Sequence, residues 1–107
     1  MKLIGKRLLD DAFAEDATGV ADCRRTGPDE TTHHIEWGEG VSSGIVAIEA
    51  APRPSYTGTW EILDTVTFDG TAPKVDIVRL EGSYGAMRHR ITQIVTDGTV
   101  RSKVEGS

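Results

Sequence analysis

Short runs of alternating residues, most of them closed by a glycine- or proline-containing turn, recur along this sequence. Six or seven runs of about five to ten residues follow one another, from "VADCRR" through "GIVAIEAAPRP" to "TVRSKVEG". This spacing is typical of an all-β sandwich or barrel. Gly 12 in 107 residues exceeds the usual ~7% and agrees with a chain of many turns. We therefore predict one all-β domain, an antiparallel jelly-roll-like sandwich with little helix.

The run at residues 59–68 has the clearest period of two, as a half-buried strand requires. Its apolar face carries Trp60, Ile62, Val66 and Phe68. Similar patterns in the other runs extend the predicted core to eight residues, adding Ile48, Ile77, Ile91 and Val100.

Turn residues suggest how consecutive strands connect. "TDGT" at residues 96–99 predicts a tight hairpin, because Asp-Gly accepts the positive φ of a type I′ turn. "FDGTAPK" is a longer connection of the same kind. "HHIEW" and "GIVAIEA" are expected to be two strands of a hairpin, joined by the loop "GEGVSSG".

Residues 1–17 show neither a clear strand pattern nor a clear helix pattern. A short amphipathic helix over residues 6–14 and an extended arm are both compatible with them. We predict an N-terminal arm over residues 1–17, followed by the sandwich over residues 18–107. The arm has more apolar side chains than a free tail should expose, so we expect it to contact a neighbouring subunit through Leu3, Ile4, Leu8, Leu9 and Phe13.

The histidines are the first candidates for chemistry. On a strand His33 and His34 point to opposite faces, so one metal ion cannot easily take both. His89 lies far along the chain, and zinc needs three or four ligands of fixed geometry. We expect partly exposed strand histidines and no metal site.

No other constellation indicates catalysis. The single cysteine, Cys23, is expected to be a buried, inert thiol. The acid pairs Asp10–Asp11 and Asp29–Glu30 are expected on the solvated surface. No GxSxG elbow surrounds the serines, and the glycine cluster at residues 38–44 does not precede a helix. We predict a protein that is not an enzyme and binds no cofactor.

Charge and hydropathy narrow the class of partner. The net charge of −5 disfavours nucleic acid. No run of about 18 apolar residues predicts a membrane span, and the opening residues do not make a secretory signal. Arg88 and Arg90 have two interpretations: cross-strand pairing with acids, or the polar rim of an interface with a protein partner.

Four stretches carry a resemblance to a known family: "SGIVAIEAAP" at residues 43–52, "GTWEILDTVT" at 58–67, "YGAMRHRITQI" at 84–94 and the final "DGTVRSKVEG". From residue 18 onward the chain resembles small β-sandwich virion proteins of tailed bacteriophages. The resemblance implies a capsid decoration (cement) protein in the virion, or else a neck or tail accessory. Its partners would be the major capsid protein or other virion subunits, including copies of itself.

A second function class is a carbohydrate-binding module. The loop "RPSYTGTW" carries Tyr56 and Trp60, which could stack on a sugar ring, although Trp60 is better explained as core. Trp37 is expected to pack beneath an edge of the sandwich or against a neighbouring subunit.

Overall fold

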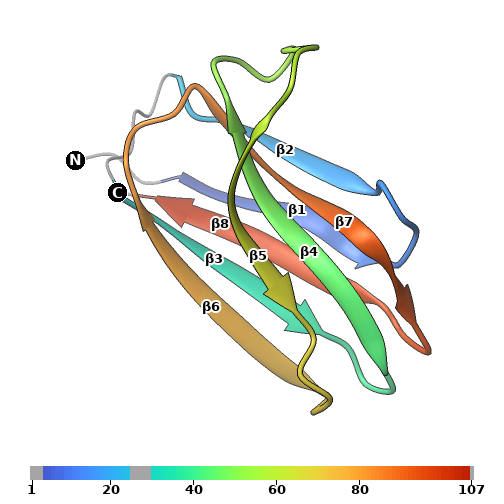
Figure 1. Ribbon diagram of the computed structural model, residues 1–107. Coiled ribbons are helices and arrows are strands. Elements are labelled where there is room, and N and C mark those ends of the chain that lie inside the picture. Colours follow the sequence, from blue (N-terminus) through green and yellow to red (C-terminus); the bar gives the residue numbers. More distant parts are fainter. Residues whose placement is uncertain (1–3, 25–29, 107) are drawn as a thin grey trace.

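Two four-stranded β-sheets packed face to face form the protein (Figure 1). The computed structural model describes residues 4–24 and 30–106. The first sheet has the order β1-β8-β3-β6 and the second the order β2-β7-β4-β5, with every neighbouring pair antiparallel. The strands are β1 (Ile4–Ala12), β2 (Thr18–Asp22), β3 (Glu30–Trp37), β4 (Ser43–Ala51), β5 (Glu61–Thr67), β6 (Lys74–Glu81), β7 (Ala86–Thr96) and β8 (Val100–Gly106).

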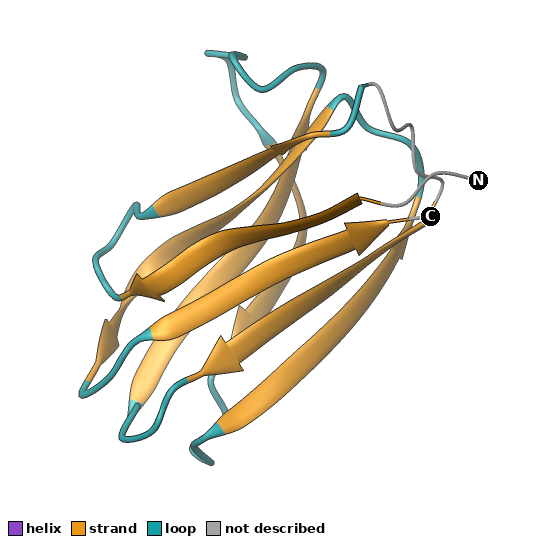
Figure 2. Ribbon diagram, turned by 180° about the vertical axis from the view of Figure 1, so that it is seen from behind, coloured by secondary structure: helices purple, strands orange, loops and turns teal. Residues whose placement is uncertain are grey.

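This strand order is that of a jelly roll, an eight-stranded double sheet built from two Greek keys. Figure 2 shows strands and loops alone, and no helix occurs in the described ranges. The part of the chain that the structure describes therefore contains no helix long and apolar enough to cross a membrane. The predicted all-β, jelly-roll-like sandwich is confirmed.

The predicted hairpins are wrong, although the strands themselves were found. β7 and β8, on either side of Asp97–Gly98, belong to different sheets, as do β3 and β4, and β5 and β6. Among the strands in the described ranges, β4 and β5 are the only consecutive ones that pair with each other. A turn signal marks where the chain reverses, but the same residues serve a hairpin or a crossing between two sheets.

The predicted arm is also corrected, because β1 is an edge strand of the first sheet and pairs with β8. A register shift between Arg7 and Leu9 places Leu8 and Leu9 both among the buried core residues. β1 also lies against β2: a Cβ atom added at Gly19 would overlap the Leu8 carbonyl. The segment is part of the sandwich, and the strict alternation that would have revealed it is broken by the bulge.

Most of the predicted core is confirmed. Six of the eight residues are buried: Ile48, Trp60, Val66, Phe68, Ile91 and Val100. Trp60 packs in a small second cluster with Ala51 and Ala86, and the other five belong to the main core between the sheets.

Ile62 and Ile77 are the two errors, with 56% and 57% of their surface exposed. In β5 the register passes from Ile48↔Asp64 to Glu49↔Ile62, so Leu63 is an extra residue that reverses the alternation. In β6, Asp76 rather than Ile77 faces inward, because its carboxylate accepts a hydrogen bond from the indole of buried Trp37 at 2.8 Å.

Candidate functional site

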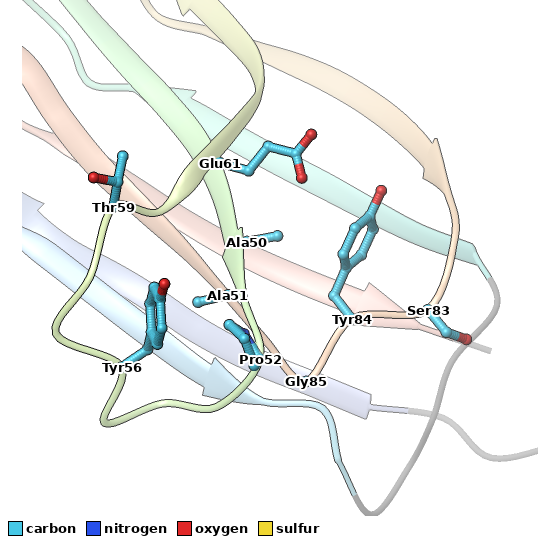
Figure 3. Close-up of a pocket in the computed structure, with 9 residues that line it drawn as sticks. All are labelled: Ala50, Ala51, Pro52, Tyr56, Thr59, Glu61, Ser83, Tyr84 and Gly85. Carbon is cyan, nitrogen blue, oxygen red and sulfur yellow. The ribbon is translucent and has the colours of Figure 1, made fainter.

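A pocket of about 350 Å³ opens at one end of the sandwich, between the β4–β5 loop and the β6–β7 loop (Figure 3). Tyr56 and Tyr84 lie on opposite sides of it, one from each loop. The residues that line it are Ala50, Ala51, Pro52, Tyr56, Thr59, Glu61, Ser83, Tyr84 and Gly85. Pockets that bind small molecules begin at about 300 Å³ and combine aromatic walls with a few polar groups.

Tyr56 is held in place by its own loop. Its amide N–H donates to the carbonyl of Arg53 at 3.1 Å, which closes a turn. Its carbonyl accepts a hydrogen bond from the indole of Trp60 at 3.0 Å. The Arg53 guanidinium lies 5.4 Å from the centre of the Tyr56 ring, at cation–π distance. The loop that carries this tyrosine is therefore fixed by several contacts.

The two loops meet at Gly85. A Cβ atom at this position would overlap the carbonyl of Pro52, so the backbones approach more closely than any side chain permits. The Gly85 carbonyl also accepts a hydrogen bond from the Cys23 amide at 2.9 Å. Cys23 itself is buried as predicted, and burial raises the pKa of its thiol.

A cluster of ion pairs covers the outer face of the second sheet, next to this pocket. Glu49 is only 2% exposed and accepts hydrogen bonds from Arg88 at 2.6 Å and from Arg90 at 3.1 Å. Burial alone would raise the pKa of Glu49, but the hydrogen bonds from Arg90 and Arg88 outweigh it and lower the pKa. Arg90 also pairs with Asp16, and the Arg88 guanidinium stacks 4.3 Å from the Trp60 ring centre.

These contacts bear on the two interpretations of Arg88 and Arg90, cross-strand pairing and the polar rim of an interface. Arg88 and Arg90 both pair with Glu49 on the neighbouring strand β4, as the cross-strand interpretation predicts, and a role in the polar rim of an interface stays a prediction. Through Trp60, the cluster also supports the loop that holds Tyr56.

The interior holds a second polar group, a hydrogen-bonded pair of histidines that joins the two sheets. His33 on β3 and His89 on β7 are both fully buried, with 2.7 Å between His33 Nδ1 and His89 Nε2. His33 Nε2 lies 2.8 Å from Thr31 Oγ1, and His89 Nδ1 lies 2.7 Å from Ser102 Oγ. His33 and His34 do point to opposite faces, but only His34 is partly exposed, so that prediction is wrong for His33.

The hydrogen bonds run in series from Thr31 through His33 and His89 to Ser102, and the groups at the two ends of this series fix which atom donates in each bond. The Leu9 amide donates to Ser102 Oγ at 3.1 Å, and the Thr31 hydroxyl donates to Met87 Sδ at 3.7 Å. Thr31 Oγ1 therefore accepts from an imidazole, and the Ser102 hydroxyl donates to His89. With both imidazoles neutral and protonated at Nε2, every donor and acceptor is satisfied. Burial is the main cause that lowers the pKa of His33 to about 4 and that of His89 to about 3.

The other predicted contact residues divide between core and surface. Trp37 is buried and meets Phe68 edge to face, with 5.4 Å between the ring centres, so it packs inside the sandwich. Leu8 and Leu9 are buried, whereas Phe13, in the β1–β2 loop, is 54% exposed. Leu3 and the side chain of Ile4 lie outside the described residues. No group of three or more His, Cys, Asp or Glu within the described ranges is arranged to hold a metal ion.

The pocket was only partly visible in the sequence. The loop "RPSYTGTW" indicates Tyr56, but Tyr84 and Glu61 fall within runs that predict strands. Only the fold brings residues 50–61 beside residues 83–85.

Comparison with known proteins gives similarity of fold. Neither a protein-family model nor a curated protein sequence matches the chain. The K2 cleaved adhesin domain of Lys-gingipain has a TM-score of 0.67 at 10% identity, over 86% of this chain and 63% of its own length. The SPBc2 prophage-derived protein YomS has a TM-score of 0.65 at 12% identity, over 98% and 92%. The Yersinia pseudotuberculosis-derived mitogen has a TM-score of 0.53 at 8% identity, over 98% and 85%. At these identities the likeness supports the β-sandwich fold.

Proposed function

We propose that this protein is a structural subunit of a phage virion, a decoration protein that binds the outside of the head. The phage context rests on the resemblance to small virion sandwiches and on the fold shared with a prophage-derived protein over nearly the full length of both chains. The observation that carries the proposal is the side of the sandwich formed by the edge strands β5 and β6, here called the open side.

The open side differs from the opposite one, where β1 and β2 pack together (Figure 1). Within the part of the chain that the structure describes, β5 and β6 each have one edge that pairs with no other strand, and both strands carry exposed branched apolar residues. Ile62 on β5 and Val75 and Ile77 on β6 are 56%, 47% and 57% exposed. Proteins usually protect such edges from pairing with another chain, so an edge with exposed branched side chains fits a contact with a partner.

The rest of the outer face of the first sheet, over β1, β8 and β3, is a weaker candidate. Its exposed side chains pair with one another, as in Arg7–Glu36 at 3.6 Å and Lys103–Glu105 at 3.4 Å. Solvated pairs of this kind contribute little to stability or to binding. Contacts through the open side would be modest singly, but repetition over a capsid lattice multiplies them.

The test uses heads of the parent phage assembled without this protein. Purified protein should sediment with the heads and raise the temperature at which they release DNA. Ile77→Lys should weaken binding at least about tenfold, which corresponds to roughly 1.4 kcal/mol. Ile94→Lys is the matched control, because Ile94 is 48% exposed but lies on β7.

The outcomes separate the two parts of the proposal. Equal binding by Ile77→Lys and the parent protein would show that the open side is not the contact. If the parent protein ignores heads and purifies with tails, the decoration role itself is wrong. Deletion of the first residues is not a suitable test, because β1 is part of the first sheet.

A further inference from the structure

We propose that the pocket between the β4–β5 and β6–β7 loops binds a neutral saccharide. This activity is distinct from head binding: the pocket lies between two loops at one end of the sandwich and reaches the open side at Glu61, the first residue of β5, whereas the head contact is tested at Ile77 on β6. Its volume of about 350 Å³ is within the range of small-molecule sites.

The charges at the pocket favour a ligand without net charge. Among the described residues that line it, Glu61 has the one charged side chain, and no described residue forms an ion pair with Glu61. This carboxylate disfavours an anionic ligand. Arg53 is not among the lining residues, but its guanidinium lies 5.4 Å from the centre of the Tyr56 ring and brings a positive charge to the Tyr56 side of the pocket, which disfavours a cationic ligand.

The residues that line the pocket favour a ligand that has both an apolar face and hydroxyl groups. Tyr56 and Tyr84 face the pocket from opposite sides, and the Glu61 side chain lies between them in this view, while Thr59 lies on the side of Tyr56 (Figure 3). A tyrosine offers an apolar ring and a polar tip. A pyranose ring fits these lining groups, because its C–H face packs on an aromatic ring while its hydroxyls donate hydrogen bonds to a carboxylate.

The pocket is held ready for such a ligand. The Trp60 indole donates a hydrogen bond to the Tyr56 carbonyl. The Arg88 guanidinium covers the Trp60 ring and forms an ion pair with Glu49. The opposite wall is fixed where Gly85 meets the Pro52 carbonyl. Side chains ordered before binding lose less entropy when a ligand arrives, which favours affinity for a small, weakly held sugar.

The experiment follows backbone amide NMR signals of the full chain during titration with single compounds. Neutral probes are methyl β-D-glucopyranoside, methyl β-D-galactopyranoside, methyl α-D-mannopyranoside and N-acetyl-D-glucosamine. Choline and N-acetylneuraminic acid are the cationic and anionic probes. At least one neutral probe should shift the signals of Ala51, Glu61 and Gly85, with a Kd of about 1 mM or tighter.

Two variants test the assignment, each with a matched control. Tyr56→Ala and Glu61→Gln should each weaken binding about tenfold, the second without altering the packing of the loop. Phe13→Ala and Glu39→Gln change an exposed aromatic and an exposed carboxylate at the other end of the sandwich, and should bind as the parent does. A lack of shifts with every neutral probe overturns the proposal. Preferential binding of choline or N-acetylneuraminic acid, or unchanged affinity in Glu61→Gln, also overturns it.

Discussion

Acidification should unfold this protein through the buried pair His33–His89. The folded chain holds both imidazoles neutral, with pKa values of about 4 and about 3. In the unfolded chain both would titrate near 6.5. Below pH 6.5 the unfolded state therefore binds more protons than the folded state, and the free energy of unfolding falls as the pH falls. The stabilisation is fully present above pH 6.5 and is lost as the pH drops toward 4 and then 3.

The size of the effect follows from the proton count. Each histidine contributes about 1.4 kcal/mol per pH unit, so the pair should remove roughly 5 kcal/mol between pH 7 and pH 4.5. Such a loss is comparable with the whole stability of a small domain, about 5–15 kcal/mol. The lowered pKa of Glu49 adds its own loss only as the pH falls below about 4.5, so the range above that pH isolates the histidines.

Urea unfolding followed by tryptophan fluorescence, at half-unit steps from pH 7.5 to pH 4.5, measures this dependence. His89→Gln can still donate to His33 and accept from Ser102, but it does not titrate, so it should show about half of the parent slope. His34→Gln replaces a histidine outside the pair and is the control. A free energy of unfolding that stays constant within about 1 kcal/mol over this range, or an unchanged slope in His89→Gln, would refute the reasoning.

Three further substitutions, the last with a matched control, test the packing described above, each by chemical unfolding at pH 7. Trp37→Ala should destabilise the fold by about 3–5 kcal/mol, because it empties a fully buried aromatic site; a loss below about 1 kcal/mol would contradict this. Glu49→Gln should cost about 1.5–3 kcal/mol, since three charge-assisted hydrogen bonds are weakened, and high salt should not reproduce the loss. Gly85→Ala should be strongly destabilising through overlap with Pro52, whereas Gly5→Ala, with open space around its Cβ position, should be nearly neutral.

The strands were predictable wherever one face alternates without interruption. Runs such as "TTHHIEWGEG" and "TVRSKVEG" became β3 and β8 because their apolar positions keep a period of two. β1 was missed since its bulge sends the adjacent residues Leu8 and Leu9 both into the core. Ile62 was misplaced for a related reason, because the bulge at Leu63 exchanges the faces of β5.

The candidate sites were less predictable because their partners are distant in the sequence. In β6 both faces carry apolar residues, so the sequence pattern does not say which face is buried. The hydrogen bond between Asp76 and Trp37 places the face of Asp76 inward. His33 meets His89 only because β3 and β7 lie in opposite sheets across one core. Local alternation assigns a side chain to a face, but it does not name the residue that it will meet there.

The place of β8 in the first sheet has a consequence for how the chain is made. β8 lies between β1 and β3, so both strands need it as a neighbour. Leu9 and its partner Ser102 are 93 residues apart, and β1 therefore emerges from the ribosome long before its pairing strand exists. Folds dominated by such distant pairing form slowly and expose unpaired strands while they wait. We expect the nascent chain to need protection by chaperones until β8 has been synthesised.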